Sequence, residues 1–166
     1  MRTDKIYLVG FMGAGKSTVA RALGARLGWR SEDIDELIAS RERRSIAEIF
    51  ARRGEPYFRA LERTVLHDLL AERHTIVATG GGTFAEADNR AVINADGASI
   101  WLDVPFEQVV ERIPADGRRP LATDRTTLRA LFDTRRAAYS FAHLRLEAGR
   151  APAGELAERI LDWLGD

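Results

Sequence analysis

The chain has 166 residues, enough for one domain with a proper core and too few for two ordinary domains. Lys and Arg together number 25, as do Asp and Glu, so the net charge is zero, which argues against a general electrostatic surface for nucleic acids or membranes. Cysteine is absent, which excludes disulfides, thiol chemistry and cysteine-based zinc sites.

The first predicted element is a strand that runs directly into a phosphate-binding loop. Residues 6–9 form an apolar run, and residues 10–17 follow the pattern G-x-x-x-x-G-K-S. Glycines in such a loop let backbone N–H groups point at phosphate oxygens, the lysine reaches the β- and γ-phosphates, and the serine ligates Mg²⁺. A helix predicted over residues 18–27 directs its positive N-terminus at the bound anion. The sequence therefore predicts a nucleoside triphosphate site formed by Gly13, Ala14, Gly15, Lys16, Ser17 and Thr18.

Strands and helices alternate along the rest of the chain. The further predicted strands cover residues 29–33, 75–78, 99–102 and 144–146. The further predicted helices cover residues 45–53, 55–72, 106–113, 124–141 and 154–164, and Gly54 separates the first two. Residues 114–123 lack an apolar period, which is typical of a mobile surface segment. Buried strands that alternate with helices predict a three-layer α/β/α fold with a parallel sheet, in which ligands bind beyond the carboxyl ends of the strands.

Acidic residues follow two of the predicted strands. Asp33 and Asp35 lie two positions apart, so an extended backbone would place both carboxylates on the same side. One of them could assist Mg²⁺ while the other orients or deprotonates an acceptor hydroxyl; the alternative is that the pair caps the next helix. Asp103 resembles the acid of a Walker B strand, but Val-Pro and a helix follow at once, so we interpret it as a helix cap.

Three glycines, Gly80 to Gly82, come directly after the strand predicted over residues 75–78. They indicate either a close approach of the backbone to a ligand or a loose turn. The three histidines show no spacing typical of a metal site or a catalytic triad, and we interpret them as structural.

Taken in order, these motifs resemble the shikimate kinase family, which belongs to the small P-loop kinases of nucleoside-monophosphate-kinase type. The resemblance extends from Ile6 to about Leu164. The matching motifs are GFMGAGKST (10–18), DID (33–35), RSIAEIF (44–50), GEPYFRALE (54–62), TGGGT (79–83), GRRPL (117–121) and RRAAY (135–139). The last motif lacks the Pro-Leu of the family's R-x-P-L-Y pattern; its spacing to Tyr139 favours Arg135 as the functional residue, with Arg136 as the alternative.

The resemblance implies a P-loop NTPase fold with about five parallel strands in one domain over residues 1–166, with a lid near 112–124 and a substrate-binding helical region near 33–62. It implies an ATP- and Mg²⁺-dependent kinase that phosphorylates the 3-hydroxyl of shikimate. The implied catalytic residues are Lys16, Asp35 and Arg119. The implied shikimate-binding residues are Asp35, Arg59, Gly80, Gly81, Gly82 and Arg135. Arg112, Arg119 and Arg150 are implied to bind ATP in addition to the loop, and Ser17 and Asp33 to lie at the metal.

Two other functions share part of this pattern. A gluconate kinase or another small-metabolite kinase has the same loop and fold, although the FRxxE, GGG and RPL motifs argue against it. A nucleotide-binding switch is disfavoured because the chain lacks the N-K-x-D guanine signature and retains every group needed for phosphoryl transfer. With no apolar signal segment and no run that could span a bilayer, we expect a cytoplasmic monomer whose partners are shikimate and ATP, not nucleic acid or membrane.

Overall fold

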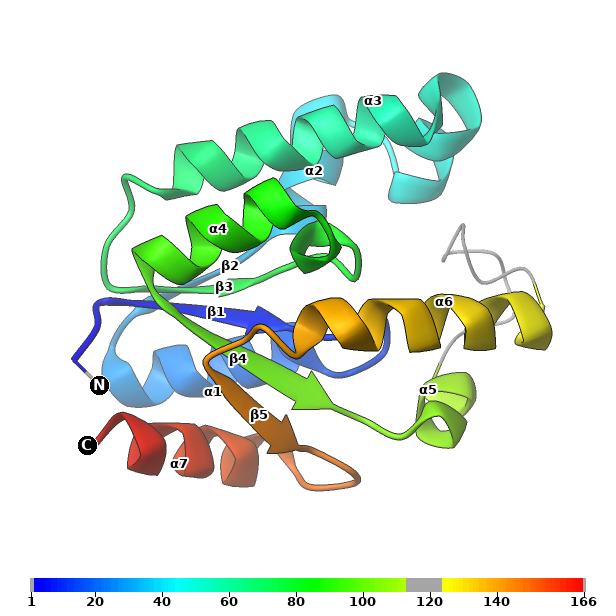
Figure 1. Ribbon diagram of the computed structural model, residues 1–166. Coiled ribbons are helices and arrows are strands. Elements are labelled where there is room, and N and C mark those ends of the chain that lie inside the picture. Colours follow the sequence, from blue (N-terminus) through cyan, green and yellow to red (C-terminus); the bar gives the residue numbers. More distant parts are fainter. Residues whose placement is uncertain (1, 113–123, 166) are drawn as a thin grey trace.

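A central sheet of five parallel strands forms the middle layer of the protein (Figure 1). The computed structural model describes residues 2–112 and 124–165. The strands are β1 (Lys5–Val9), β2 (Arg30–Asp33), β3 (Thr75–Ala78), β4 (Ala98–Asp103) and β5 (Leu144–Glu147), in the spatial order β2-β3-β1-β4-β5. The predicted parallel sheet is confirmed, whereas most of the predicted lid, Arg119 included, lies outside the described residues.

Helices cover both faces of this sheet (Figure 1). They are α1 (Lys16–Leu27), α2 (Ile34–Glu42), α3 (Ile46–Leu69), the 3-10 helix η1 (Thr83–Ala85), α4 (Ala87–Asp96), α5 (Phe106–Arg112), α6 (Arg125–Tyr139) and α7 (Ala153–Leu164). Helices α1 and α7 pack together on one face, and α3 and α4 lie over the other. This arrangement confirms the predicted three-layer α/β/α fold. Among the described residues, no helix combines the length and the apolar character needed to cross a bilayer.

The burial of the strands explains why some were easier to predict than others. β1, β3 and β4 are buried along their whole length, as expected for apolar runs covered by helices on both faces. β2 has the polar sequence Arg-Ser-Glu-Asp and lies at the edge of the sheet, where its first two residues are exposed. Polar residues are tolerated there because only β3 pairs with this strand.

Helix α3 bends at the position where the sequence predicts a break. Gly54 has φ 82° and ψ 171°, a conformation outside the helical region that favours glycine. The predicted capping box is also present, because the side chain of Ser45 accepts from the backbone N–H of Glu48 and the Glu48 side chain reaches back to Ser45. The helix ends at Leu69, slightly earlier than predicted.

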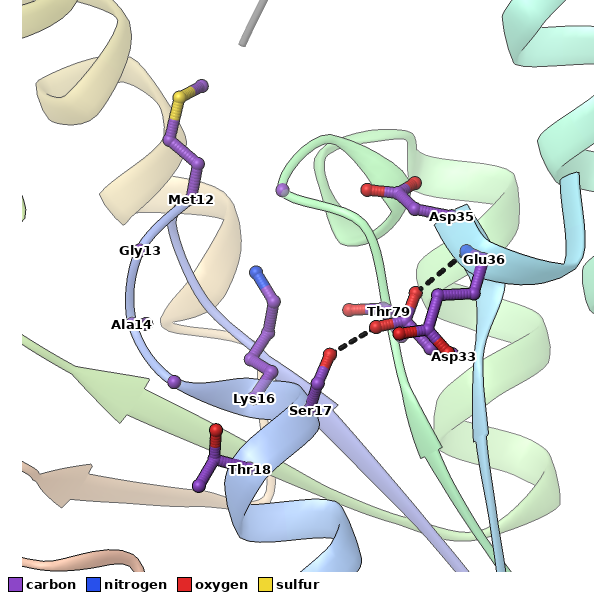
Figure 2. Close-up of a pocket in the computed structure, with 12 residues that line it drawn as sticks. Met12, Gly13, Ala14, Lys16, Ser17, Thr18, Asp33, Asp35, Glu36 and Thr79 are labelled. Atoms are coloured by element: carbon purple, nitrogen blue, oxygen red, sulfur yellow. Dashed lines mark hydrogen bonds between the residues drawn. The ribbon is translucent and has the colours of Figure 1, made fainter. Parts of the chain in front are cut away.

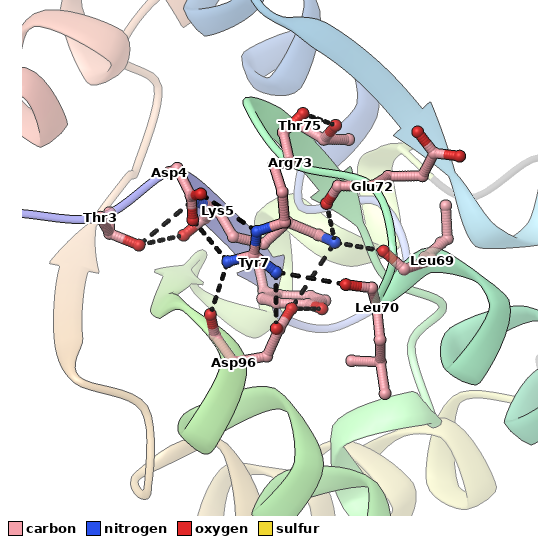
Figure 3. A network of polar contacts seen from close by, with 10 residues as sticks. All are labelled: Thr3, Asp4, Lys5, Tyr7, Leu69, Leu70, Glu72, Arg73, Thr75 and Asp96. Atoms are coloured by element: carbon pink, nitrogen blue, oxygen red, sulfur yellow. Dashed lines mark hydrogen bonds and ion pairs between the residues drawn. The ribbon is translucent and has the colours of Figure 1, made fainter.

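A network of charges around the buried Lys5 closes the amino-terminal edge of the sheet (Figure 3). The Lys5 ammonium group is fully buried, donates to the carbonyl oxygens of Leu69 and Glu72, and lies 3.5 Å from the Asp96 carboxylate. Asp96 also accepts from the Tyr7 hydroxyl at 2.6 Å and from Arg73 at 2.7 Å. The network therefore ties the start of β1 to the ends of α3 and α4.

Asp96→Asn tests the contribution of this network to stability. Burial raises the pKa of Asp96, but the donors Tyr7 and Arg73 outweigh burial and hold the pKa below its usual 3.8. A carboxyl with a lowered pKa stabilises the fold above pH 3.8, and this stabilisation is lost as the pH falls. We expect Asp96→Asn to lower the free energy of unfolding by about 2 kcal/mol at neutral pH, because an amide nitrogen replaces an acceptor.

Urea denaturation at several pH values measures this effect, with the exposed Asp162→Asn as the control. The difference between wild type and Asp96→Asn should narrow as the pH falls below 3.8, since the wild-type carboxyl then takes up a proton. A difference that stays constant down to the acid limit of folding would contradict the assignment of the charged network.

Candidate active site

The loop between β1 and α1 has the backbone conformation of a phosphate cradle. Gly13 and Gly15 have φ values of 79° and 93°, in the left-handed region that side chains other than glycine rarely adopt. Helix α1 begins at Lys16, immediately after the loop, so its positive N-terminus lies at the cradle. The Lys16 ammonium group donates to the carbonyl oxygens of Gly10 and Phe11, which hold it within the loop.

A cavity of about 390 Å³ opens beside this loop at the carboxyl ends of β1, β2 and β3 (Figure 2). It is lined by Met12, Gly13, Ala14, Gly15, Lys16, Ser17, Thr18, Asp33, Asp35, Glu36, Thr79 and Gly81. Figure 2 shows the loop on one side of the cavity and Asp33, Asp35 and Thr79 on the other. All six predicted loop residues, both predicted carboxylates and one of the three predicted glycines therefore share one cavity.

Asp33 caps the next helix, as one of the predicted alternatives has it, and also contacts the phosphate-binding loop. One carboxylate oxygen caps α2 by accepting from the backbone N–H of Glu36 at 3.1 Å, and the other accepts from the Ser17 hydroxyl. Asp35 lies in the first turn of α2, so the backbone between the two acids is not extended. The turn from strand to helix nevertheless leaves both acids at the cavity.

The oxygens of Ser17 and Asp33 fit a magnesium ion. The hydrogen bond between them brings a hydroxyl and a carboxylate together beside the phosphate cradle. Over residues 2–112 and 124–165, His, Asp and Glu form no cluster of three or more that could hold a metal without help. Mg²⁺ is commonly held by one or two protein oxygens together with substrate phosphates, and this pair supplies such oxygens.

A buried carboxylate holds one of the predicted substrate-binding arginines. Glu62 is fully buried and accepts from Arg59 at 3.1 Å and from the Thr83 hydroxyl at 2.8 Å. Burial raises the pKa of Glu62, although Arg59 and Thr83 oppose the shift. Arg59 also pairs with Glu55 at 3.3 Å, so its guanidinium group is held from two sides. Neither Glu62 nor Thr83 was among the predicted site residues, although each ends a motif quoted for the family, GEPYFRALE and TGGGT.

The two adjacent arginines of α6 have different surroundings. Arg135 is 6% exposed, and its guanidinium group lies 5.9 Å from the Phe11 ring and close to Gly81. Burial lowers the pKa of Arg135, and none of the described carboxylates forms an ion pair with it. Arg136 donates to Asp103 at 2.6 Å and stacks on Trp101. The geometry therefore favours Arg135 as the arginine at the site.

Asp103 does not act as the helix cap that the sequence analysis expected. Its carboxylate accepts from Arg136 at 2.6 Å and from Arg145 at 2.6–2.8 Å. Asp103 ends the buried strand β4, where guanidinium groups from α6 and β5 converge on it. The Asp103 carboxylate therefore accepts from these two guanidinium groups, where a helix cap would accept from backbone N–H groups of the following helix.

Of the two described arginines outside the loop that were predicted to contact the nucleotide, Arg112 contacts the phosphate-binding loop and Arg150 does not. Arg112 donates to the carbonyl oxygens of Gly13 at 3.0 Å and Gly149 at 3.2 Å, which places it against the phosphate cradle. Arg150 is exposed and pairs with Glu111 at 3.0 Å. Gly80 and Gly82 flank Gly81 beside Asp35 and Arg59, although only Gly81 lines the cavity itself.

Comparisons with known proteins agree with this site. The family model "Shikimate kinase" matches residues 12–165. The shikimate kinase of Persephonella marina is 42% identical over 149 residues, which cover 89% of this chain and 91% of that protein. The solved structure of shikimate kinase from Acinetobacter baumannii in complex with shikimate has a TM-score of 0.93 and 36% identity, covering 98% of this chain and 93% of that chain. Shikimate kinase from Aquifex aeolicus has a TM-score of 0.87 and 37% identity, covering 96% and 95%.

The range matched by the family model spans the carboxylates of the cavity, the two arginines of the site and the three glycines between β3 and η1. The structural likeness extends over nearly the whole chain at identities well above those that indicate a shared fold alone. The chain belongs to the shikimate kinase family.

Proposed function

We propose that the protein transfers the γ-phosphoryl group of ATP to the 3-hydroxyl of shikimate, giving shikimate 3-phosphate and ADP. The observation that carries this proposal is the buried Arg135, which lies near Gly81 at the phosphate-binding cavity without a described carboxylate partner. A buried cation of this kind is costly unless an anion joins it. The carboxylate of shikimate is such an anion, and its hydroxyls suit the carboxylate of Asp35.

On the nucleotide side, the chain supplies positive groups for the phosphates. Backbone N–H groups of the loop and the N-terminus of α1 bind phosphate oxygens, and Lys16 exchanges its contacts with Gly10 and Phe11 for the β- and γ-phosphates. Ser17 and Asp33 would hold Mg²⁺, which neutralises charge on the phosphates when bound. Arg119, outside the described residues, stays a sequence prediction for the transferred phosphoryl group.

On the acceptor side, the chain supplies two cations and one acid. Arg59 and Arg135 bind the shikimate carboxylate, for which the planar guanidinium group is well suited because it can donate two parallel hydrogen bonds. Asp35 orients the acceptor hydroxyl and takes its proton as the oxygen attacks the γ-phosphorus. The cytoplasmic location and the monomeric state stay predictions from the sequence.

A coupled assay of ADP release tests the proposed reaction. We expect turnover with shikimate and little with gluconate or nucleoside monophosphates, at the same concentration of ATP and Mg²⁺. Asp35→Asn should abolish turnover while shikimate still binds, because an amide can contact the hydroxyl but cannot accept its proton. Good turnover of gluconate or a nucleotide without turnover of shikimate would overturn the proposal.

Replacing each of the neighbouring arginines by methionine tests which one binds the substrate carboxylate. Arg135→Met should raise the KM for shikimate by about 10- to 100-fold, as expected for the loss of a hydrogen-bonded charge, and leave the KM for ATP nearly unchanged. Arg136→Met is the matched control: it should lower the melting temperature by removing the contact with Asp103 and leave both KM values nearly unchanged. The reverse result would assign the carboxylate to Arg136.

A further inference from the structure

The three consecutive glycines between β3 and η1 do not depend on glycine for their backbone conformation. Gly80, Gly81 and Gly82 are not among the residues with positive φ, and Gly82 has φ −102° and ψ −5°, values that any residue adopts. At such positions alanine restricts the unfolded chain and stabilises the fold, so glycine is the less stable choice. The reason for glycine at these positions is therefore that a side chain would have no room beside the backbone.

The space where each Cβ atom would lie is filled by a side chain of the candidate active site. A Cβ atom on Gly82 would lie 2.5–2.7 Å from three guanidinium atoms of Arg59. On Gly81 it would lie 3.2 Å from Nη1 of Arg135. On Gly80 it would lie 2.8 Å from Oδ1 of Asp35. Three successive glycines thus face, in turn, the acid and the two arginines proposed to bind the substrate.

We propose that Gly80, Gly81 and Gly82 are positioning residues that determine the spacing of Asp35, Arg135 and Arg59 by leaving room for each of them. This inference rests on the proposed function, because it takes these three side chains as the shikimate-binding groups. Non-bonded carbon and nitrogen atoms pack at about 3.5 Å, so a methyl group on Gly82 displaces the Arg59 guanidinium by about 1 Å. A displacement of about this size can cost a reaction 100-fold.

A substitution at Gly82 can distinguish this positioning role from a general role in folding. The atoms that its Cβ would meet are the end of one long side chain, which can move without disturbing the backbone. Arg59 is held by Glu62 and Glu55, so a displaced guanidinium group leaves its productive position. Gly80 is less suitable for a test, because its Cβ would also lie 3.1 Å from the fully buried Glu62 and would strain the fold.

The test is a double-mutant cycle in the full-length protein between Gly82→Ala and Arg59→Ala, with the KM for shikimate, the KM for ATP and the melting temperature measured for each variant. Gly82→Ala alone should raise the KM for shikimate by about tenfold or more, with the KM for ATP within about twofold and little loss of melting temperature. In the Arg59→Ala background it should change the KM for shikimate by less than about twofold, because no guanidinium group remains to be displaced.

The matched control is Gly154→Ala in α7. Its Cβ would lie 3.3 Å from the Arg26 guanidinium, an arginine of α1 that pairs with Glu158 on the surface. We expect both KM values to stay within about twofold of the wild type. If Arg59→Ala does not fold, because Glu62 is left buried without its cation, Gly81→Ala with Arg135→Ala forms a second cycle. Gly81→Ala should raise the KM for shikimate by a smaller factor than Gly82→Ala, because its Cβ would lie 3.2 Å from the Arg135 guanidinium, and this rise should vanish in the Arg135→Ala background.

The positioning role would be overturned if Gly82→Ala raised the KM for shikimate by the same factor in the wild-type and Arg59→Ala backgrounds. It would also be overturned if the KM for ATP rose as much as the KM for shikimate. Wild-type protein that does not phosphorylate shikimate would overturn the proposed function instead. A crystal structure of Gly82→Ala distinguishes the two failures, because it reports the position of Arg59 whatever the substrate is. A guanidinium group that has not moved would overturn the positioning role alone.

Discussion

The site depends on the parallel register of three neighbouring strands. Asp33 of β2 is level with Ala78 of β3, and Ala78 is level with Leu8 of β1. Because the strands run in the same direction, the segments that follow them emerge at one edge of the sheet. These segments are the phosphate-binding loop, the first turn of α2 and the three glycines. A strand reversed at this position would place Asp33 or the glycines at the opposite edge, far from the bound phosphates.

The two edges of the sheet use buried charge in opposite ways. At the amino-terminal edge, the two cations Lys5 and Arg73 are balanced by the carboxylates of Asp96 and Asp4. The carbonyl oxygens of α3 and the following turn take the remaining donors of Lys5. That cluster is complete, so it stabilises the fold without a ligand. At the carboxyl-terminal edge, Glu62 neutralises Arg59, whereas Arg135 has no described carboxylate partner. The buried guanidinium group of Arg135 there creates a preference for an anion.

Helix α6 connects the substrate side of the site to the far strands of the sheet. Arg136 and Arg145 bind Asp103 and flank the ring of Trp101, which joins α6 to β4 and β5. Tyr139, one turn after Arg135, donates its hydroxyl to the carbonyl oxygen of Gly81 at 2.5 Å and packs against Trp101. The hydrogen bond from Tyr139 holds this end of α6 at the glycine segment, where Arg135 lies.

The sequence alone determined the features that depend on neighbouring residues. The phosphate-binding loop, the buried strands β1, β3 and β4, the kink at Gly54 and the capping box all follow from local patterns, because backbone conformation and strand burial are encoded within a few positions. The polar edge strand β2 gave only a weak signal, since an edge strand needs no apolar run. The spacing to Tyr139 favoured Arg135 over Arg136, but only the tertiary structure showed their different surroundings, assigned Asp103 to two arginines and included Glu62 in the site. Adjacent helical residues point about 100° apart, so what each of them contacts depends on where distant strands and glycines lie, and the sequence next to them does not contain those positions.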